Sequence, residues 1–215
     1  MPLTKKPGRP KDEQLQARRE EEILDAAAVL FAKTGYADTD VQVLADQLQV
    51  GKGTIYRYFP SKRELFLATV DRGMQRLHAA VETRVAQVED GLERIVTAIT
   101  AFLQFFSEQP ELVELFVQER AHFKDRAQPA YFAVHQAKVG PWREMYQQLV
   151  AAGRVRDCDH AEEHDVVSDL LYGTILANHF TGRRVSYEVQ ARNIVDMVFL
   201  GILTESERRR FQVKQ

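Results

Sequence analysis

The segment from residue 50 to residue 63 gathers side chains that suit binding to phosphate. It holds four cations and no acid, with aromatic residues between them: Lys52, Tyr56, Arg57, Tyr58, Phe59, Lys62 and Arg63. Lysine and arginine pair with phosphate oxygens, and tyrosine hydroxyls donate hydrogen bonds to them. Because such a cluster has little use inside a core, it predicts a surface that binds a nucleic-acid backbone.

Two short helices joined by a tight turn are expected to position this cluster. Apolar residues recur at helical spacing from 41 to 48, and Thr39 followed by Gln42 is typical of a capping box at a helix start. Residues 49–51 form the turn, and a second helix runs from Lys52 to Phe59 before Pro60 ends it. This arrangement is a helix-turn-helix, whose second helix can lie in the major groove of DNA.

The second helix of this pair is too short to be stable alone, so packing must hold it. Val50, Ile55 and Phe59 can face inward, against apolar residues of the preceding helices. Gly51 and Gly53 at its start allow the backbone to come close to another surface.

A longer segment, residues 18–68, matches a known pattern in order, spacing and residue type. Its pieces are Ile23-Leu24, Ala26-Ala27, Leu30-Phe31, Gly35-Tyr36, Thr39, Leu44-Ala45, the run from Lys52 to Phe59, and Ser61-Lys62. The segment resembles the DNA-binding domain of the tetracycline-repressor (TetR) family of transcriptional regulators. The resemblance implies phosphate contacts from Thr54, Tyr56, Tyr58, Lys62 and the helix start at Thr39. It also implies that the residues nearest the base edges are Lys52, Gly53 and Arg57.

Two positions depart from the family pattern. The family often has glycine in the turn, where this chain has Gln49, and serine at the start of the recognition helix, where it has Gly51. Glycine at that position costs about a few tenths of a kcal/mol relative to serine. We therefore expect a slightly looser recognition helix with its function intact.

The whole chain limits the classes of protein that it can be. Its 215 residues are 45% hydrophobic and 28% charged, enough for a sizeable core, and the formal net charge of -2 conceals the basic segment. A single cysteine, Cys158, rules out an internal disulfide. No signal peptide and no apolar run of about 18 residues are present, which predicts a cytoplasmic protein without a membrane span. No catalytic motif is present either, so we expect neither an enzyme nor a cofactor.

Helical periodicity throughout the chain and the lack of a convincing strand predict an all-α fold. We expect a flexible basic arm at 1–14, a three-helix DNA-binding domain with the helix-turn-helix at 15–63, a ligand-binding and dimerisation bundle at 64–204, and a charged tail at 205–215. A fourth helix, capped by Ser61 and Glu64, should extend to about residue 88. Later helices are expected at 90–107, 110–125, 128–152, 163–183 and 187–204, with a kink or split at Gly140-Pro141.

Aromatic residues are dense between 102 and 146, and each belongs either to the core or to the lining of a pocket. The family binds small molecules inside this bundle, which implies an apolar or aromatic effector with a few polar anchors. The candidate pocket residues are Phe102, Phe105, Phe106, Phe116, Glu119, His122, Phe123, Trp142 and Tyr146.

The last two helices are candidates for a dimer interface, with internal packing as the alternative. The residues expected at this interface lie along one face of each helix or are small enough to let two helices approach closely. They are Leu170, Leu171, Gly173, Ile175, Ala177, His179, Met197, Val198 and Gly201. By resemblance, these helices pair with their counterparts in a homodimer. A twofold dimer would place two recognition helices about one DNA turn, or a multiple, apart on a pseudo-palindromic operator.

Two further segments have two interpretations each. The residues around Arg9, PGRPK, have the shape of an AT-hook, whose arginine enters the minor groove, or they form a basic tail that adds non-specific affinity. The residues from Cys158 to His164 include metal-capable side chains, although a helix cap at Asp159 is the simpler interpretation. We predict no metal site.

These features predict a homodimeric, ligand-responsive transcriptional regulator, and specifically a repressor that a small-molecule effector releases from double-stranded operator DNA. One alternative is an architectural or cell-cycle factor on the same fold without an inducer, which a fully packed interior would favour. Another is a small-molecule binding protein or helical enzyme whose helix-turn-helix is vestigial.

Overall fold

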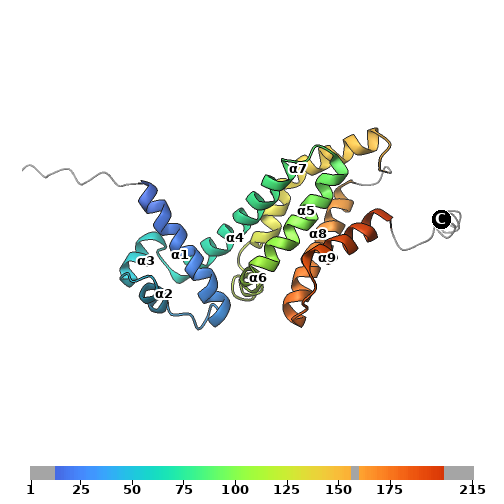
Figure 1. Cartoon of the computed structure of the whole chain (residues 1–215). Coiled ribbons are helices and arrows are strands. Elements are labelled where there is room, and N and C mark those ends of the chain that lie inside the picture. Colours follow the sequence, from blue (N-terminus) through green and yellow to red (C-terminus); the bar gives the residue numbers. More distant parts are fainter. Residues whose placement is uncertain (1–12, 156–159, 201–215) are drawn as a thin grey trace, which may run out of the picture. The chain divides into compact units, whose positions relative to one another are not determined.

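The computed structural model describes residues 13–155 and 160–200, and its regular elements are helices (Figure 1). They are α1 (Glu13–Thr34), α2 (Val41–Gln47), α3 (Lys52–Tyr58), α4 (Lys62–Val85), α5 (Gly91–Glu108), α6 (Glu111–His122), α7 (Ala130–Ala151), α8 (His160–Thr181), α9 (Tyr187–Val195) and a short π-helix, Asp196–Leu200. No strand occurs in these two ranges, which confirms the all-α fold. None of the helices described is long and apolar enough to cross a membrane.

The helix bounds agree with the sequence predictions within a few residues, with one exception near the C-terminus. Ser61 caps α4 as predicted, because its Oγ accepts a hydrogen bond from the Glu64 backbone N–H at 3.1 Å. The exception is α9, which changes to the π-helix at Asp196, where the sequence predicts one continuous helix.

The chain divides into two compact units, Met1–Arg72 and Gly73–Gln215, and the division falls inside α4. The boundary expected from the sequence, after residue 63, lies at the start of the same helix. The two differ because the first turns of α4 bury Leu65 and Phe66, and Phe66 packs against residues of the first unit. The ends of the chain, 1–12 and 201–215, lie outside the described residues.

An aromatic cluster forms the centre of the first unit. Phe31 of α1 and Phe66 of α4 are buried, and their rings meet edge to face with centroids 5.0 Å apart. The ring of Tyr36 packs on the same Phe66 ring at 5.2 Å. Arg72 of α4 also donates from Nε to Glu21 of α1 at 2.7 Å. Helices α1 and α4 are therefore joined by an apolar and an ionic contact.

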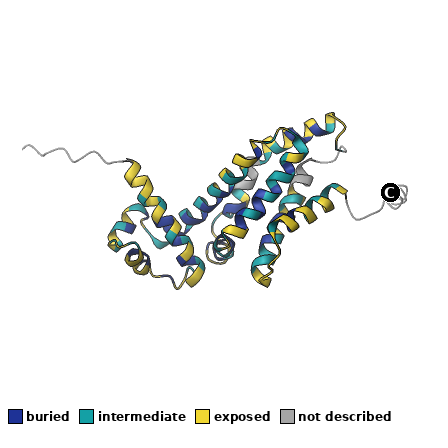
Figure 2. Ribbon diagram, in the orientation of Figure 1, coloured by how far each residue is buried: buried dark blue, intermediate teal, exposed yellow. Residues whose placement is uncertain are grey.

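Helix α5 is the centre of the second unit. Seven of its 18 residues are buried, and α7, α8 and α9 all pack against it. In Figure 2 it is coloured as buried or intermediate along most of its length. Aromatic rings continue from it onto α6 and α7, with centroids 5.8 Å apart between Phe106 and Phe116 and 6.1 Å apart between Phe116 and Tyr131. Burial of such large side chains contributes about 1.5–3 kcal/mol each.

Helix α7 continues through Pro141, so the split that the sequence allowed at this position does not occur. A proline inside a helix costs about 3 kcal/mol, because it lacks an N–H group and its ring crowds the preceding turn. The burial of Tyr131, Met145 and Leu149 on the same helix offsets that cost.

Glu119 is a buried carboxylate that joins α6 to α7. Only 2% of the residue is exposed, and its two oxygens lie 3.1 and 3.2 Å from the Ala130 backbone nitrogen, which donates to them. Arg126 donates to the same carboxylate at 2.7 Å. Ala130 is the first residue of α7, and Pro129 before it makes no side-chain cap. Glu119 therefore acts as the cap, because it accepts the hydrogen bond from the first N–H group of the helix.

Replacement of this carboxylate should destabilise the second unit. We expect Glu119→Ala to lower its free energy of unfolding by about 3 kcal/mol, because a buried N–H group and a cation lose their partner. Urea unfolding followed by circular dichroism measures the change. Glu119→Gln, which keeps an acceptor for Ala130, is the matched control and should lose less. Equal stabilities of Glu119→Ala and the unaltered chain would contradict this role.

Candidate nucleic-acid interface

Helix α3 has one buried face and one exposed face. Ile55 has no exposed surface and Phe59 retains 6%, so both belong to the core of the first unit, as the sequence predicts. Val50, expected beside them, is half-buried. The other face of α3 is partly or fully exposed and consists of Lys52, Gly53, Tyr56 and Arg57. Lys52 and Tyr56 lie four residues apart, as do Gly53 and Arg57, so the four positions share one side of the helix.

The turn before α3 contains a residue in the left-handed conformation. Gln49 has a φ of 54°, and its N–H donates to Asp46 O at 3.1 Å, while the Val50 N–H donates to Ala45 O at 2.9 Å. This pair of hydrogen bonds is the Schellman motif, in which glycine is the usual left-handed residue. The left-handed backbone at position 49 therefore explains why glycine would suit this turn better than the glutamine that this chain has.

Thr39 does not cap α2. Its side chain is buried, and Oγ1 donates to the Gly35 carbonyl at 2.6 Å, which fixes the loop between α1 and α2. Asp40 is the N-cap instead, because its Oδ1 accepts from the Gln42 backbone N–H at 2.8 Å. The predicted capping box at Thr39 and Gln42 is therefore wrong by one residue. The short side chain of aspartate competes effectively for this position.

Lys52 and Asp40 join the start of α3 to the start of α2. Lys52 Nζ lies 2.9 Å from the Asp40 oxygen that also caps α2. The Gln42 N–H and then Lys52 hold the pKa of Asp40 below its usual value, and Asp40 in turn raises the pKa of Lys52. The ammonium has three N–H donors, so two remain for a partner outside the chain.

Lys62 fastens the loop between α1 and α2 to the start of α4. Its ammonium donates to the backbone carbonyls of Ala37 at 2.9 Å and Thr39 at 3.1 Å. It also lies 4.9 Å from the centroid of the Tyr36 ring. Two of its three donors are thus used inside the chain, and one remains for an external anion.

The remaining predicted contact residues surround these cations. Tyr56 is 37% exposed, while Thr54 and Tyr58 are half-buried. The Arg57 guanidinium lies 5.4 Å from the centroid of the Tyr58 ring.

The two glycines at the start of α3 occupy open space. A Cβ atom at Gly51 or Gly53 would meet nothing within 4 Å, and neither residue has a positive φ. Packing inside the chain therefore does not require glycine at either position.

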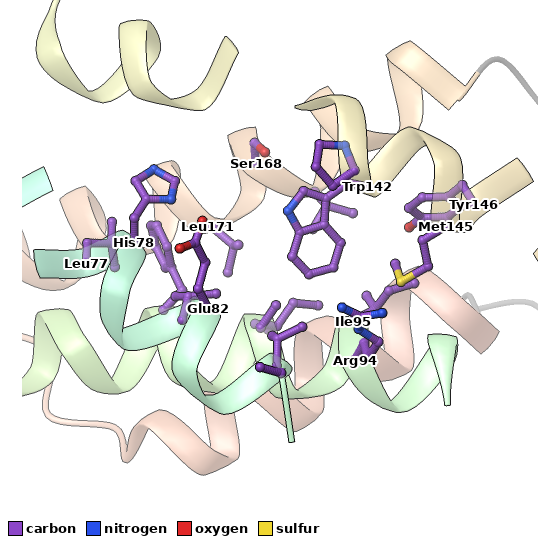
Figure 3. Close-up of a pocket in the computed structure, with 18 of the residues that line it drawn as sticks. Leu77, His78, Glu82, Arg94, Ile95, Trp142, Met145, Tyr146, Ser168 and Leu171 are labelled. Carbon is purple, nitrogen blue, oxygen red and sulfur yellow. The ribbon is translucent and has the colours of Figure 1, made fainter. Parts of the chain in front are cut away.

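The second unit contains a cavity of about 400 Å³ (Figure 3). Its walls come mainly from α4, α5, α7 and α8. They are largely apolar, and their polar or charged side chains include His78, Glu82, Arg94 and Ser168. Tyr131, also in the wall, donates from its hydroxyl to the Ser168 carbonyl at 3.4 Å, and burial raises its pKa. The volume and the apolar walls are typical of small-molecule sites.

The structure separates the residues predicted for a pocket. Phe102, Trp142 and Tyr146 line this cavity. The other predicted residues lie outside this lining. Glu119 is bound to Arg126, and His122 is exposed. The remaining four are buried aromatics of the core: Phe105, Phe106, Phe116 and Phe123. Sequence reasoning missed the walls from α4 and α8, which have no dense aromatic cluster. It also missed Arg94, although a cation in the first turn of a helix opposes the helix dipole and was a usable signal.

The residues predicted for a dimer interface divide between the interior and the surface of the second unit. Leu171 and Ile175 are buried, and His179 Nε2 lies 2.8 Å from Glu114 Oε2. Leu170, Gly173 and Met197 are exposed, and Ala177 and Val198 are half-buried. Other large apolar side chains on α8, α9, their connection and the π-helix are also exposed: Val166, Phe180, Val185, Val189 and Leu200. Several predicted sites lie outside the described residues, namely Arg9, Cys158, Asp159 and Gly201, and so do the side chains of 160–164.

Known proteins share this sequence pattern. Residues 23–69 match the family model described as "Bacterial regulatory proteins, tetR family". An uncharacterized HTH-type transcriptional regulator of Mycobacterium tuberculosis is 34% identical over 110 residues, which are 49% of this chain and 54% of that protein. The HTH-type transcriptional repressor KstR of the same species is 29% identical over 99 residues, 46% of this chain and 45% of the repressor. This chain thus matches about half the length of each relative.

Solved structures share the fold over most of the chain. The TetR family transcriptional regulator PfmR from Thermus thermophilus has a TM-score of 0.70 and 25% identity, over 85% of this chain and 99% of that chain. The transcriptional regulator FadR from Bacillus subtilis, in complex with stearoyl-CoA, has a TM-score of 0.70 and 15% identity over the same shares.

The left-handed turn residue gives a direct stability prediction. Gln49→Gly should raise the free energy of unfolding of the first unit by about 1 kcal/mol, because glycine adopts positive φ without a steric cost. Thermal unfolding measures the change. Gln47→Gly, at the last residue of α2, is the matched control and should lower stability by a similar amount. A loss of stability in Gln49→Gly would contradict the assigned conformation.

Proposed function

We propose that this chain, a member of the tetR family of bacterial regulatory proteins, is a DNA-binding transcriptional regulator that represses its targets and leaves DNA when an effector binds. The observation that carries the proposal is the exposed face of α3. There Lys52 and Arg57 flank Gly53 on a helix whose other face is buried. A basic helix held in this way fits the major groove of DNA.

The proposed contacts with DNA are of two kinds, to base edges and to phosphates. Lys52, Gly53 and Arg57 lie nearest the base edges, where arginine and lysine pair with guanine. The phosphate contacts come from Thr54, Tyr56, Tyr58 and Lys62. Thr39 acts indirectly in this scheme, since its hydroxyl holds the loop whose carbonyls bind Lys62.

The effector site is the cavity of the second unit. Its mainly apolar wall supports an apolar effector, and the shared fold with FadR, solved with stearoyl-CoA, is consistent with that class. Helix α4 carries Lys62 at its start and the cavity residues Met74 and Leu77 further along. A ligand that displaces those residues therefore acts on the same helix that fastens the DNA-binding loop.

The partner in DNA binding is a second copy of the chain. Phe180 is 66% exposed, Leu200 59% and Val166 58%, an unusual exposure for large apolar side chains on neighbouring elements. A twofold interface over α8, α9 and the π-helix would cover them. Leu170, Gly173 and Met197 join this surface, whereas Leu171 and Ile175 support it from the interior.

The cavity also bears on the alternative of an architectural factor without an inducer. That alternative is favoured by a fully packed interior. A cavity of about 400 Å³ with polar side chains in its wall instead favours a ligand-responsive regulator.

Selection from random double-stranded DNA, followed by binding across a salt series, tests the proposed function. We expect a pseudo-palindromic sequence to emerge, with affinity that falls steeply in salt because released counterions drive binding. Protection of two half-sites in a footprint would identify the dimeric operator. Binding that is indifferent to sequence would contradict the proposal and favour the architectural factor.

Gly53→Ala separates the fold from DNA binding. Alanine fits the free chain and has the higher helix propensity, so the free energy of unfolding should rise by about 0.5–1 kcal/mol. The added methyl group meets the DNA, so affinity for the selected sequence should fall by at least about tenfold. Unfolding curves and fluorescence anisotropy measure the two effects.

Gly140→Ala is the matched control for this prediction. Gly140 lies in α7 of the second unit, where a Cβ atom would also meet nothing within 4 Å. This variant should gain stability and keep its DNA affinity. An unchanged affinity in Gly53→Ala would show that the backbone of α3 does not approach DNA.

A further inference from the structure

Arg94 lines the cavity and carries a buried donor atom for which the described residues supply no acceptor. Its Nε atom is shielded from solvent and makes no hydrogen bond within the described part of the chain. A buried donor without a partner costs stability, and native structures keep such groups mainly where something else satisfies them.

The acid next to Arg94 along the chain is already bound. Asp90 caps α5 by accepting from the backbone N–H groups of Leu92 and Glu93, both at 3.0 Å. It also pairs with Arg154, which is the main reason that its pKa lies below the usual value. Asp90 therefore has little left to offer Arg94.

The position of Arg94 in its helix adds to its cost. It lies in the first turns of α5, where the positive end of the helix dipole disfavours a cation. An anion bound to its guanidinium would relieve both the missing hydrogen bond and this repulsion. Guanidinium binds carboxylate and phosphate through two parallel hydrogen bonds, which makes it selective for such groups.

The rest of the cavity suits an apolar body. Figure 3 shows Arg94 toward one end of the site and His78 with Glu82 toward the other, with the Trp142 indole between them. The Glu82 carboxylate would repel an anion at its end, so the charges of the wall give a bound anion one orientation. Apolar side chains such as Ile95 and Met145 lie near the Arg94 end in the same view.

We infer that the effector is an amphipathic anion, with an apolar body against Trp142 and a terminal carboxylate or phosphate on Arg94. This inference rests on the proposed function and names the ligand class of the same cavity. It goes beyond size and apolarity, because an uncharged ligand of the same shape can offer the guanidinium only a neutral acceptor and no charge-assisted pair of hydrogen bonds.

Trp142 provides the measurement, because it is the single tryptophan of the chain and lies in the cavity wall. Three probes with one alkyl body separate the contributions: decanoate, decyl phosphate and decanol. We expect at least one anion to shift Trp142 emission at a concentration about tenfold or more below that of decanol. Decanoate and decyl phosphate distinguish the two sources of the anionic group.

Arg94→Met assigns this preference to the guanidinium. The anion should lose at least about tenfold in affinity, while decanol binding should stay nearly unchanged and so show that the cavity is intact. Arg94→Lys, which keeps the charge without the planar fork, should retain part of the preference. Arg143→Met removes an exposed charge one residue beyond Trp142 and is the matched control, with no expected effect.

Three outcomes overturn the inference. Equal binding of decanol and both anions to the unaltered chain does so, and so does an anion preference that survives in Arg94→Met. The third is the absence of any Trp142 response to all three probes. Binding of the same samples to the selected DNA is measured in parallel. If one of these outcomes occurs but the unaltered chain still binds the selected DNA, only the anionic effector is excluded and the proposed regulator stands. If the unaltered chain binds no specific DNA, the proposed function itself fails.

Discussion

The length of α3 is the constraint on which the proposed DNA-binding surface depends. A helix of seven residues has no stability of its own in water, so every side chain that it exposes is positioned by contacts elsewhere. Burial of Ile55 and Phe59 sets its rotation, and the Lys52–Asp40 pair joins it to α2. Lys62 then holds the loop before α2 through two carbonyls. Two of the cations proposed to contact DNA therefore also support the fold.

The second unit presents the complementary problem, a cavity inside a well-packed helical core. Helix α5 contributes seven buried residues to this core, yet the wall that it shares with α4, α7 and α8 encloses about 400 Å³. That wall includes the Nε of Arg94, which has no hydrogen-bond partner in the part of the chain that the structure describes. Empty volume and unpaired donors both cost stability. Their presence together is typical of a site that sacrifices stability for binding. Helix α4 contributes to both units, and the proposed response to an effector rests on this shared helix.

The sequence was most informative where local rules decide the structure. Helical periodicity and the stop at Pro60 predicted α2, α3 and the inward face of Ile55, and Ser61 capped α4 as expected. The sequence-based prediction failed where two neighbouring residues could both cap a helix, as Thr39 and Asp40 could at the start of α2.

The cavity was hard to predict because its wall combines residues from four helices, and periodicity marks an inward face without saying whether a gap lies behind it. Phe102 and Phe106 are both inward-facing aromatics one turn apart, yet only Phe102 lines the cavity.

The most direct measurement of the central claim is photo-crosslinking from position 56 to the selected operator. With Tyr56 replaced by benzoylphenylalanine, we predict crosslinks to nucleotides within two symmetric half-sites and none from the same group at Gln87. No crosslink from position 56, or crosslinks spread evenly along the DNA, would contradict the assignment of α3 as the helix that reads DNA.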